Sequence, residues 1–177
     1  MDPHAPLHSS ARQDWGTPPA FMRWLKQNRN WSPDLDPAAS SENAKAPIFY
    51  DGSSEDEDGL LQPWFGNVWL NPPFGRGISQ WMNKCASEIQ KEEVQSIYAL
   101  VPARTDTKWF HDIVIPSCYL CYLIKGRFNF RFDEAIPGEN APFPSMLLLW
   151  RKPILDARFP SIATLELPQW ARGFNDE

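Results

Sequence analysis

The sequence feature that most constrains the fold is the pair of consecutive prolines in Asn71-Pro72-Pro73-Phe74. This tetrapeptide follows a short apolar run, Val68 to Leu70, and precedes a segment from Ile78 to Ile89 in which apolar residues recur at helical spacing. Proline donates no backbone hydrogen bond and disfavours helical geometry in the residue before it, so the chain must end a strand and turn rigidly there. We therefore expect the tetrapeptide at the carboxyl end of a strand, the edge of an open α/β sheet where ligands bind.

A rigid turn of this composition suits chemistry on an amino group that is conjugated to a ring. The amide oxygen of Asn71 and the backbone carbonyl of Pro72 can both accept hydrogen bonds from an exocyclic NH2, and Phe74 can stack on the ring. Fixing the amine in this way steers its lone pair out of conjugation. The same residues also describe a tight strand-to-helix turn whose phenylalanine fills the core, and a motif of four residues does not decide between the two.

Length and composition indicate one globular domain. The chain has 177 residues, of which 42% are hydrophobic, and we expect a disordered tail over residues 1–10 followed by a single domain over 11–177. No apolar run reaches the length of a membrane span and no signal-peptide pattern opens the sequence, so we expect a cytoplasmic protein. Cys85, Cys118 and Cys121 lack paired metal-ligand spacing, which predicts buried thiols and neither a disulfide framework nor a metal site.

Strand and helix patterns alternate along the chain. One helix is expected to begin at Thr17-Pro18, with the threonine hydroxyl as its cap, and to end near Asn28 to Asn30. Further strands are predicted at Val94 to Val101, Tyr119 to Ile124 and Ser145 to Trp150. This order describes a three-layer α/β sandwich whose sheet ends in an antiparallel hairpin.

Acidic residues before the proline turn are candidate cofactor ligands. A short strand would deliver Asp36 to its carboxyl end and Pro37 would stop it, so that the carboxylate can accept from a ribose hydroxyl or an amino group. Small residues such as Ala38 then permit close approach, although the segment has no glycine-rich fingerprint. Asp58 ends an acidic run that is typical of a charged surface loop, but the residues after it lead back to the core.

Charge is distributed unevenly in a chain whose formal net charge is −5. Acidic residues outnumber basic ones up to Leu60, whereas basic residues prevail from Val101 to Phe132. In the later stretch cations alternate with phenylalanines, as expected of a nucleic-acid groove, and a solvated strand face is the competing interpretation. The candidate contacts to nucleic acid are Arg104, Lys108, Arg127 and Arg131.

Five segments together resemble the phage-type DNA N6-adenine methyltransferases, a Dam-like family. They are Gln13 to Pro18, Leu35 to Asn43, Gly66 to Gly75, Val101 to His111 and Ala141 to Ser145. The resemblance implies a class I S-adenosylmethionine-dependent methyltransferase fold of Rossmann-like type. It also implies site-specific methylation of an adenine flipped out of double-stranded DNA, in the cytoplasm of a bacterium or a phage-infected host.

The resemblance further implies roles for individual residues. The catalytic turn would consist of Asn71, Pro72, Pro73 and Phe74. The S-adenosylmethionine site would include Asp14, Thr17, Pro18, Asp36, Pro37, Ala38 and Asp58, with no metal. Because the cofactor loop and the catalytic turn lie close together in the sequence, no separate recognition domain fits between them. Base recognition would therefore fall to the loops after Val101.

Two other functions remain open from the sequence. Enzymes that methylate glutamine side-chain amides in proteins also use an asparagine-proline-proline-aromatic turn, in which Asn71 would orient the amide NH2. The missing Gly-x-Gly of the cofactor loop would also fit a relative that keeps the fold, has lost cofactor affinity and serves as a nucleic-acid-binding module. The alternation of cations and phenylalanines favours nucleic acid over protein, and a cofactor titration separates an enzyme from a degenerate module.

Overall fold

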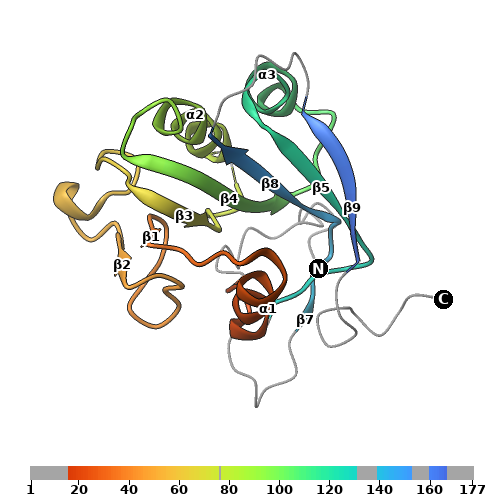
Figure 1. The fold of residues 1–177 in the computed structure, drawn as a ribbon, viewed down its shortest axis with the longest axis horizontal. Coiled ribbons are helices and arrows are strands. Elements are labelled where there is room, and N and C mark those ends of the chain that lie inside the picture. The colour runs from red at the N-terminus through yellow and green to blue at the C-terminus, as the bar shows by residue number, and fades with distance from the viewer. Residues whose placement is uncertain (1–15, 76, 131–138, 153–159, 167–177) are drawn as a thin grey trace, which may run out of the picture.

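The computed structural model describes residues 16–75, 77–130, 139–152 and 160–166. Within these ranges a twisted sheet runs through the centre of the molecule, and helices lie on both of its faces (Figure 1). The predicted tail over residues 1–10, the candidate cofactor residue Asp14 and the candidate DNA contact Arg131 lie outside the described residues. No helix in the described ranges is long and apolar enough to cross a membrane.

The central sheet has seven strands in the order β2-β1-β3-β4-β8-β5-β9. Their bounds are β1 Leu35–Asp36, β2 Ile48–Phe49, β3 Gly66–Leu70, β4 Val94–Pro102, β5 Leu120–Lys125, β8 Ser145–Arg151 and β9 Ser161–Glu166. Strand β8 is antiparallel to its neighbours β4 and β5, and every other neighbouring pair is parallel. The six other strands therefore end at the same side of the sheet, which we call the carboxyl edge.

The end of the sheet differs from the predicted terminal hairpin. Strand β8 inserts between β4 and β5, and the outermost strand is β9, which pairs with β5 in parallel. A separate small sheet joins β6, Asn129–Phe130, to β7, Glu139–Asn140. The sequence did not reveal β9 because an edge strand needs little hydrophobic alternation, and Ile162 in this strand is indeed 71% exposed.

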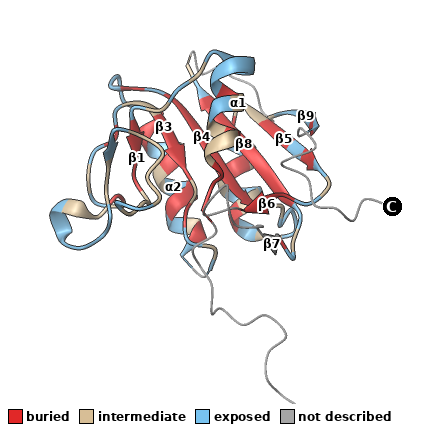
Figure 2. Cartoon of the chain, turned by 90° about the horizontal axis from the view of Figure 1, so that it is seen from below, coloured by how far each residue is buried: buried red, intermediate tan, exposed pale blue. Residues whose placement is uncertain are grey.

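Two apolar layers, one on each face of the sheet, confirm the predicted three-layer architecture. Helix α1, Pro19–Arg29, covers one face. Helix α2, Ile78–Glu88, covers the other together with the π-helical turn η2, Phe110–Val114, and α3, Ile115–Ser117. Alternate residues of β4 face the two layers, so the strand is buried along almost its whole length (Figure 2).

The start of α1 departs from the sequence prediction. Pro18 occupies the cap position, Pro19 is the first helical residue, and no side chain caps the helix. The hydroxyl of Thr17 is instead buried and has no hydrogen-bond partner among the described residues. The other end agrees with the prediction, because the helix stops at Arg29 and Asn30 adopts the left-handed conformation.

A buried carboxylate ties α2 to the chain that enters β3. Glu88 accepts a hydrogen bond from the backbone N–H of Trp64 at 3.1 Å and contacts the ammonium groups of Lys84 and Lys91 at 2.7 Å. The indole of Trp64 stacks on Trp81 of α2. Burial raises the pKa of Glu88, but the hydrogen bonds from Lys84, Lys91 and Trp64 together outweigh it and lower the pKa from 4.5.

We expect Glu88→Ala to lower the free energy of unfolding by about 3 kcal/mol, because it leaves the Trp64 N–H and the Lys84 charge without their buried partner. Urea denaturation at pH 7 measures the loss. Lys91→Ala removes only the more exposed partner and should cost less than about 1 kcal/mol. The contribution of Glu88 should disappear as the pH falls below 4.5, since its pKa is lowered in the folded state. Equal losses in the two variants would contradict this account.

Candidate active site

The carboxyl edge brings the predicted cofactor and catalytic segments together. Asp36 is the last residue of β1, and Asn71 directly follows β3, the strand that pairs with β1. Leu35 lies opposite Val68, so Asp36 and Asn71 are on adjacent strands with a stagger of two residues. From strand spacing and rise, their Cα atoms are roughly 8 Å apart. The edge thus places an acidic side chain beside the proline turn.

Asp36 is 3% exposed and both of its carboxylate oxygens bind backbone N–H groups of the following loop. One oxygen accepts from Ala38 at 3.4 Å and the other from Lys45 at 3.0 Å. Burial raises the pKa of Asp36 from 3.8 to about 6, against the opposing effect of these hydrogen bonds and of the Lys45 charge. A buried carboxyl with a raised pKa at a sheet edge is typical of a functional site.

The loop after Asp36 explains how this site can lack a Gly-x-Gly sequence. Pro37 is buried and Ala38 is half-buried, and the loop closes through the hydrogen bond from Lys45 to Asp36. None of the residues from 37 to 45 has a positive φ angle. Glycine is needed where the backbone must be left-handed, so this loop can form its turn with alanines.

The structure brings the Asp58 segment against the Asp36 loop. Gly59 is buried, and a Cβ at this position would clash with the backbone carbonyl of Pro37. The carboxylate of Asp58 accepts from the N–H of Leu60 at 2.9 Å, and Asp58 is half-buried, whereas Glu55 and Asp56 at the start of the acidic run are exposed. Asp58 therefore belongs to the same edge as Asp36.

The tetrapeptide after β3 forms the centre of the edge. Pro72 is buried, Pro73 is exposed, and the side-chain oxygen of Asn71 is shielded from solvent. The ring of Phe74 is half-buried and meets Phe143 and Phe130 edge to face, with centroids 5.5 and 6.1 Å away. These contacts fix the plane of Phe74 while leaving part of the ring accessible, as stacking on a ligand requires.

The predicted basic contacts lie partly at this edge. Arg104 follows β4, Lys108 lies four residues further along, Arg127 follows β5, and all three side chains are exposed. The prediction that the neighbouring phenylalanines share in a nucleic-acid groove is wrong. Phe128 and Phe130 are 0% and 5% exposed and pack in the α1 layer. Alternation did place them on one face, but that face is the core, so they do not offer a stacking surface for bases.

The sequence analysis did not identify two residues that lie at the edge. Tyr50 follows β2, donates its N–H to the carbonyl of Asp36, and its own carbonyl accepts from the N–H of Ala39, which fixes the loop after Asp36. The short run of Ile48–Phe49 gave too little pattern to predict a strand there. Ser145 opens β8 opposite Pro102, and its buried hydroxyl has no partner among the described residues. A hydroxyl at the start of an antiparallel strand carries no sequence signal of its own.

The three cysteines are free and buried, as the sequence predicted. Burial raises the pKa of Cys118 to about 12 and that of Cys121 to about 11, so both are neutral thiols at pH 7. Among the described residues no group of three or more histidine, cysteine, aspartate or glutamate side chains could hold a metal ion.

A mostly parallel sheet, in which adjacent strands end in a buried acidic loop and an Asn-Pro-Pro-Phe turn, defines an α/β protein of Rossmann-like type. A family comparison agrees: residues 4–169 match the DNA N-6-adenine-methyltransferase (Dam) family, and the chain belongs to that family. Methylation of adenine in DNA is the activity that this family implies. Neither the curated proteins nor the solved structures gave a match.

The buried carboxyl of Asp36 should make stability depend on pH. Because its pKa is raised to about 6, its favourable contribution is complete below 3.8 and is lost as the pH rises through 6. The free energy of unfolding of Asp36→Asn, relative to that of the unsubstituted protein, should therefore rise by about 2 kcal/mol between pH 4 and pH 7. Chemical denaturation at several pH values measures this. Asp51→Asn should show no such rise, since Asp51 is exposed and its pKa is lowered by Ser53.

Proposed function

We propose that the protein is a site-specific DNA adenine N6-methyltransferase with a class I fold, which uses S-adenosylmethionine and acts on an adenine flipped out of double-stranded DNA. The observation that carries the proposal is the position of Asn71 to Phe74 at the carboxyl edge, on the strand next to the buried Asp36 loop, in a chain of the Dam family. Ligand binding at the carboxyl ends of parallel strands is the rule for such sheets.

The residues at this edge fit S-adenosylmethionine. The small side chain of Ala38 allows a ligand to approach the backbone of the loop, and Gly59 lets the Asp58 segment pack directly against the carbonyl of Pro37. We assign Asp36 and Asp58 to the hydroxyl and amino groups of the cofactor, as hydrogen-bond acceptors. The buried hydroxyl of Thr17, which has no partner among the described residues, would supply a further polar contact, with Pro18 beside it.

The bound cofactor supplies a methyl group made electrophilic by its sulfonium. The protein orients the acceptor: the side-chain oxygen of Asn71 and the carbonyl of Pro72 take hydrogen bonds from the adenine N6 amino group. Rigid prolines hold both acceptors in place, so positioning supplies most of the rate acceleration. The nitrogen can release its proton to water once it has become cationic, and His111, which is exposed on a helical turn, needs no catalytic role.

Phe74 would hold the ring of the flipped base. Extruding a base costs a few kcal/mol, which stacking on an aromatic side chain partly repays. The edge-to-face contacts with Phe143 and Phe130 restrict the orientations of Phe74 before the base arrives. Stacking therefore needs little further loss of side-chain freedom.

Asn71→Ala should reduce methyl transfer to duplex DNA at least a thousandfold while leaving cofactor affinity within about threefold, because only the orientation of the amine is lost. Mass spectrometry of the digested DNA should detect N6-methyladenine as the product of the unsubstituted enzyme. Phe74→Tyr keeps the stacking face and should retain much of the activity that Phe74→Ala loses. Asn28→Ala, an exposed substitution in α1, is the control.

Three results would contradict the proposal, and a fourth would contradict the assignment of Asp36. N4-methylcytosine as the sole product would overturn the base assignment. Methylation of glutamine amides in proteins, without activity on DNA, would favour the protein-methylating alternative. No binding of S-adenosylmethionine at millimolar concentration in calorimetry would leave a nucleic-acid-binding module. Asp36→Ala is expected to weaken cofactor binding at least tenfold, and a smaller loss would remove Asp36 from the cofactor site.

The exposed cations Arg104, Lys108 and Arg127 are proposed to contact DNA phosphates, together with Arg131. Neutralising any one of the first three to glutamine should weaken duplex binding for every sequence and reduce the salt dependence of the affinity by about one unit of slope. Fluorescence anisotropy at several salt concentrations measures the slope. Lys91→Gln is the matched control, because Lys91 lies between α2 and the start of β4, at the opposite edge of the sheet, and pairs with Glu88. Unchanged slopes in all three variants would make these side chains ordinary surface residues.

A further inference from the structure

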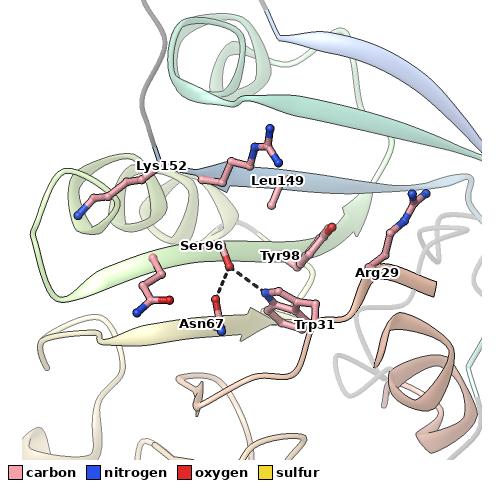
Figure 3. A pocket seen from close by; sticks show the side chains of 9 residues that line it. Arg29, Trp31, Asn67, Ser96, Tyr98, Leu149 and Lys152 are labelled. Atoms are coloured by element: carbon pink, nitrogen blue, oxygen red, sulfur yellow. Dashed lines mark hydrogen bonds between the residues drawn. The ribbon is translucent and has the colours of Figure 1, made fainter. Parts of the chain in front are cut away.

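A second concave site lies away from the carboxyl edge, on the face of the sheet that α1 covers. It is an open hollow of about 460 Å³, bounded by the end of α1, the early parts of β3 and β4, and the end of β8 (Figure 3). Asn67, which lines it, precedes Asn71 by four residues along β3, so about 13 Å of strand separates this cavity from the proposed catalytic turn. The volume is in the range of small-molecule sites.

The charged side chains that line the cavity are all cations, although the whole chain has a net charge of −5. They are Arg29, Arg151 and Lys152, and no carboxylate is among the described residues that line it. Three cations around one concave surface raise the local potential and attract anions. The cavity thus carries positive charge in a protein whose net charge is negative.

The two arginines are held by aromatic rings and not by carboxylates. Arg151 lies 4.2 Å from the ring centroid of Tyr119 and donates to its hydroxyl at 2.7 Å. Arg29 lies 5.2 Å from the ring of Tyr122. Neither guanidinium forms an ion pair with a described residue. Stacking fixes the plane of a guanidinium and leaves donors at its edges, the arrangement that suits bidentate binding of a phosphate.

A hydrogen-bond chain shapes the floor of the cavity. The indole N–H of Trp31 donates to the hydroxyl of Ser96 at 2.8 Å, and Ser96 donates to the side-chain oxygen of Asn67 at 2.7 Å (Figure 3). The oxygen of Asn67 is thereby used, and its NH2 group remains as a donor. Trp31 is also packed edge to face on Tyr98 at 4.8 Å. The floor therefore offers aromatic surface next to hydrogen-bond donors.

We propose that this cavity is a binding site for a phosphate monoester of about nucleotide size. Arg29 and Arg151 bind the phosphate, Lys152 adds a third positive charge, and the aromatic floor around Trp31 and Tyr98 takes the organic part. A nucleotide combines these two features, whereas S-adenosylmethionine carries no phosphate. The site is separate from the proposed methyl-transfer site and does not depend on it.

Thymidine 5′-monophosphate is the probe, because it has no adenine that could enter the cofactor or target site. Isothermal titration calorimetry with the full chain, with a saturating amount of the demethylated cofactor present, should detect binding that inorganic phosphate competes away. Arg29→Gln and Arg151→Gln should each weaken binding at least tenfold. Lys26→Gln, an exposed cation on the same turn of α1 as Arg29 but outside the cavity, should leave it unchanged.

Arg151→Lys tests the case in which Arg151→Gln fails to fold, since it keeps the charge and loses the planar fork; it should also weaken binding. The proposal is overturned if thymidine binds as tightly as its monophosphate, if the demethylated cofactor displaces the probe, or if both arginine variants bind normally. It is also overturned if the probe does not bind at millimolar concentration. Weaker duplex binding by Arg29→Gln without any binding of the probe would instead identify a contact to DNA.

Discussion

The parallel pairing of β1, β3 and β4 is the constraint on which the site depends. Strand β1 has only two residues and would not be stable alone, and its pairing with β2 and β3 on either side holds it in place. Because parallel strands end together, this pairing alone puts Asp36, Asn71 and the chain after Pro102 at one edge. The prolines after Asn71 then prevent β3 from continuing, and a site forms where the ladder stops.

The same edge is where the protein departs from what would be best for stability. A carboxyl with its pKa raised to about 6 is buried at Asp36, and the hydroxyls of Thr17 and Ser145 are buried without a partner in the described ranges. Unsatisfied buried polar groups each cost free energy and are rare in natural cores. Ser145 opens β8 at this edge, and a ligand bound there would complete the hydrogen bond that its hydroxyl lacks among the described residues.

Much of the fold could be predicted from the sequence because long periodic segments were present. The apolar spacing of α2 and the runs of β4, β5 and β8 gave their positions correctly. Strand β2 could not be predicted because two residues make no pattern, and β9 because an edge strand tolerates polar residues. The order of β8 and β5 in the sheet was also hidden, since strand patterns carry no information about which strands pair.

The candidate site was predicted less evenly than the fold. The turn at Asn71 was evident from its prolines, and the contact of Gly59 with Pro37 supports the segment expected beside the Asp36 loop. The cap expected from Thr17 was wrong because the helix begins one residue later, with Pro18 at the cap position and Pro19 as the first helical residue. Phe128 and Phe130 show how little an alternating polar-aromatic pattern can predict. It indicates that the two rings share a face of the strand, but not whether that face points to solvent or to the core.

The insertion of β8 between β4 and β5 has an evolutionary consequence. The chain leaves β5 at the carboxyl edge and returns to the same edge at Ser145, where the carbonyl of Pro144 accepts from the N–H of Ala103. Both ends of the intervening connection are thus anchored next to the site. Insertions or deletions between them need not shift any strand pairing in the central sheet. Related chains could accordingly differ in the length of this one segment while Phe128 and Phe130 keep their places in the α1 layer.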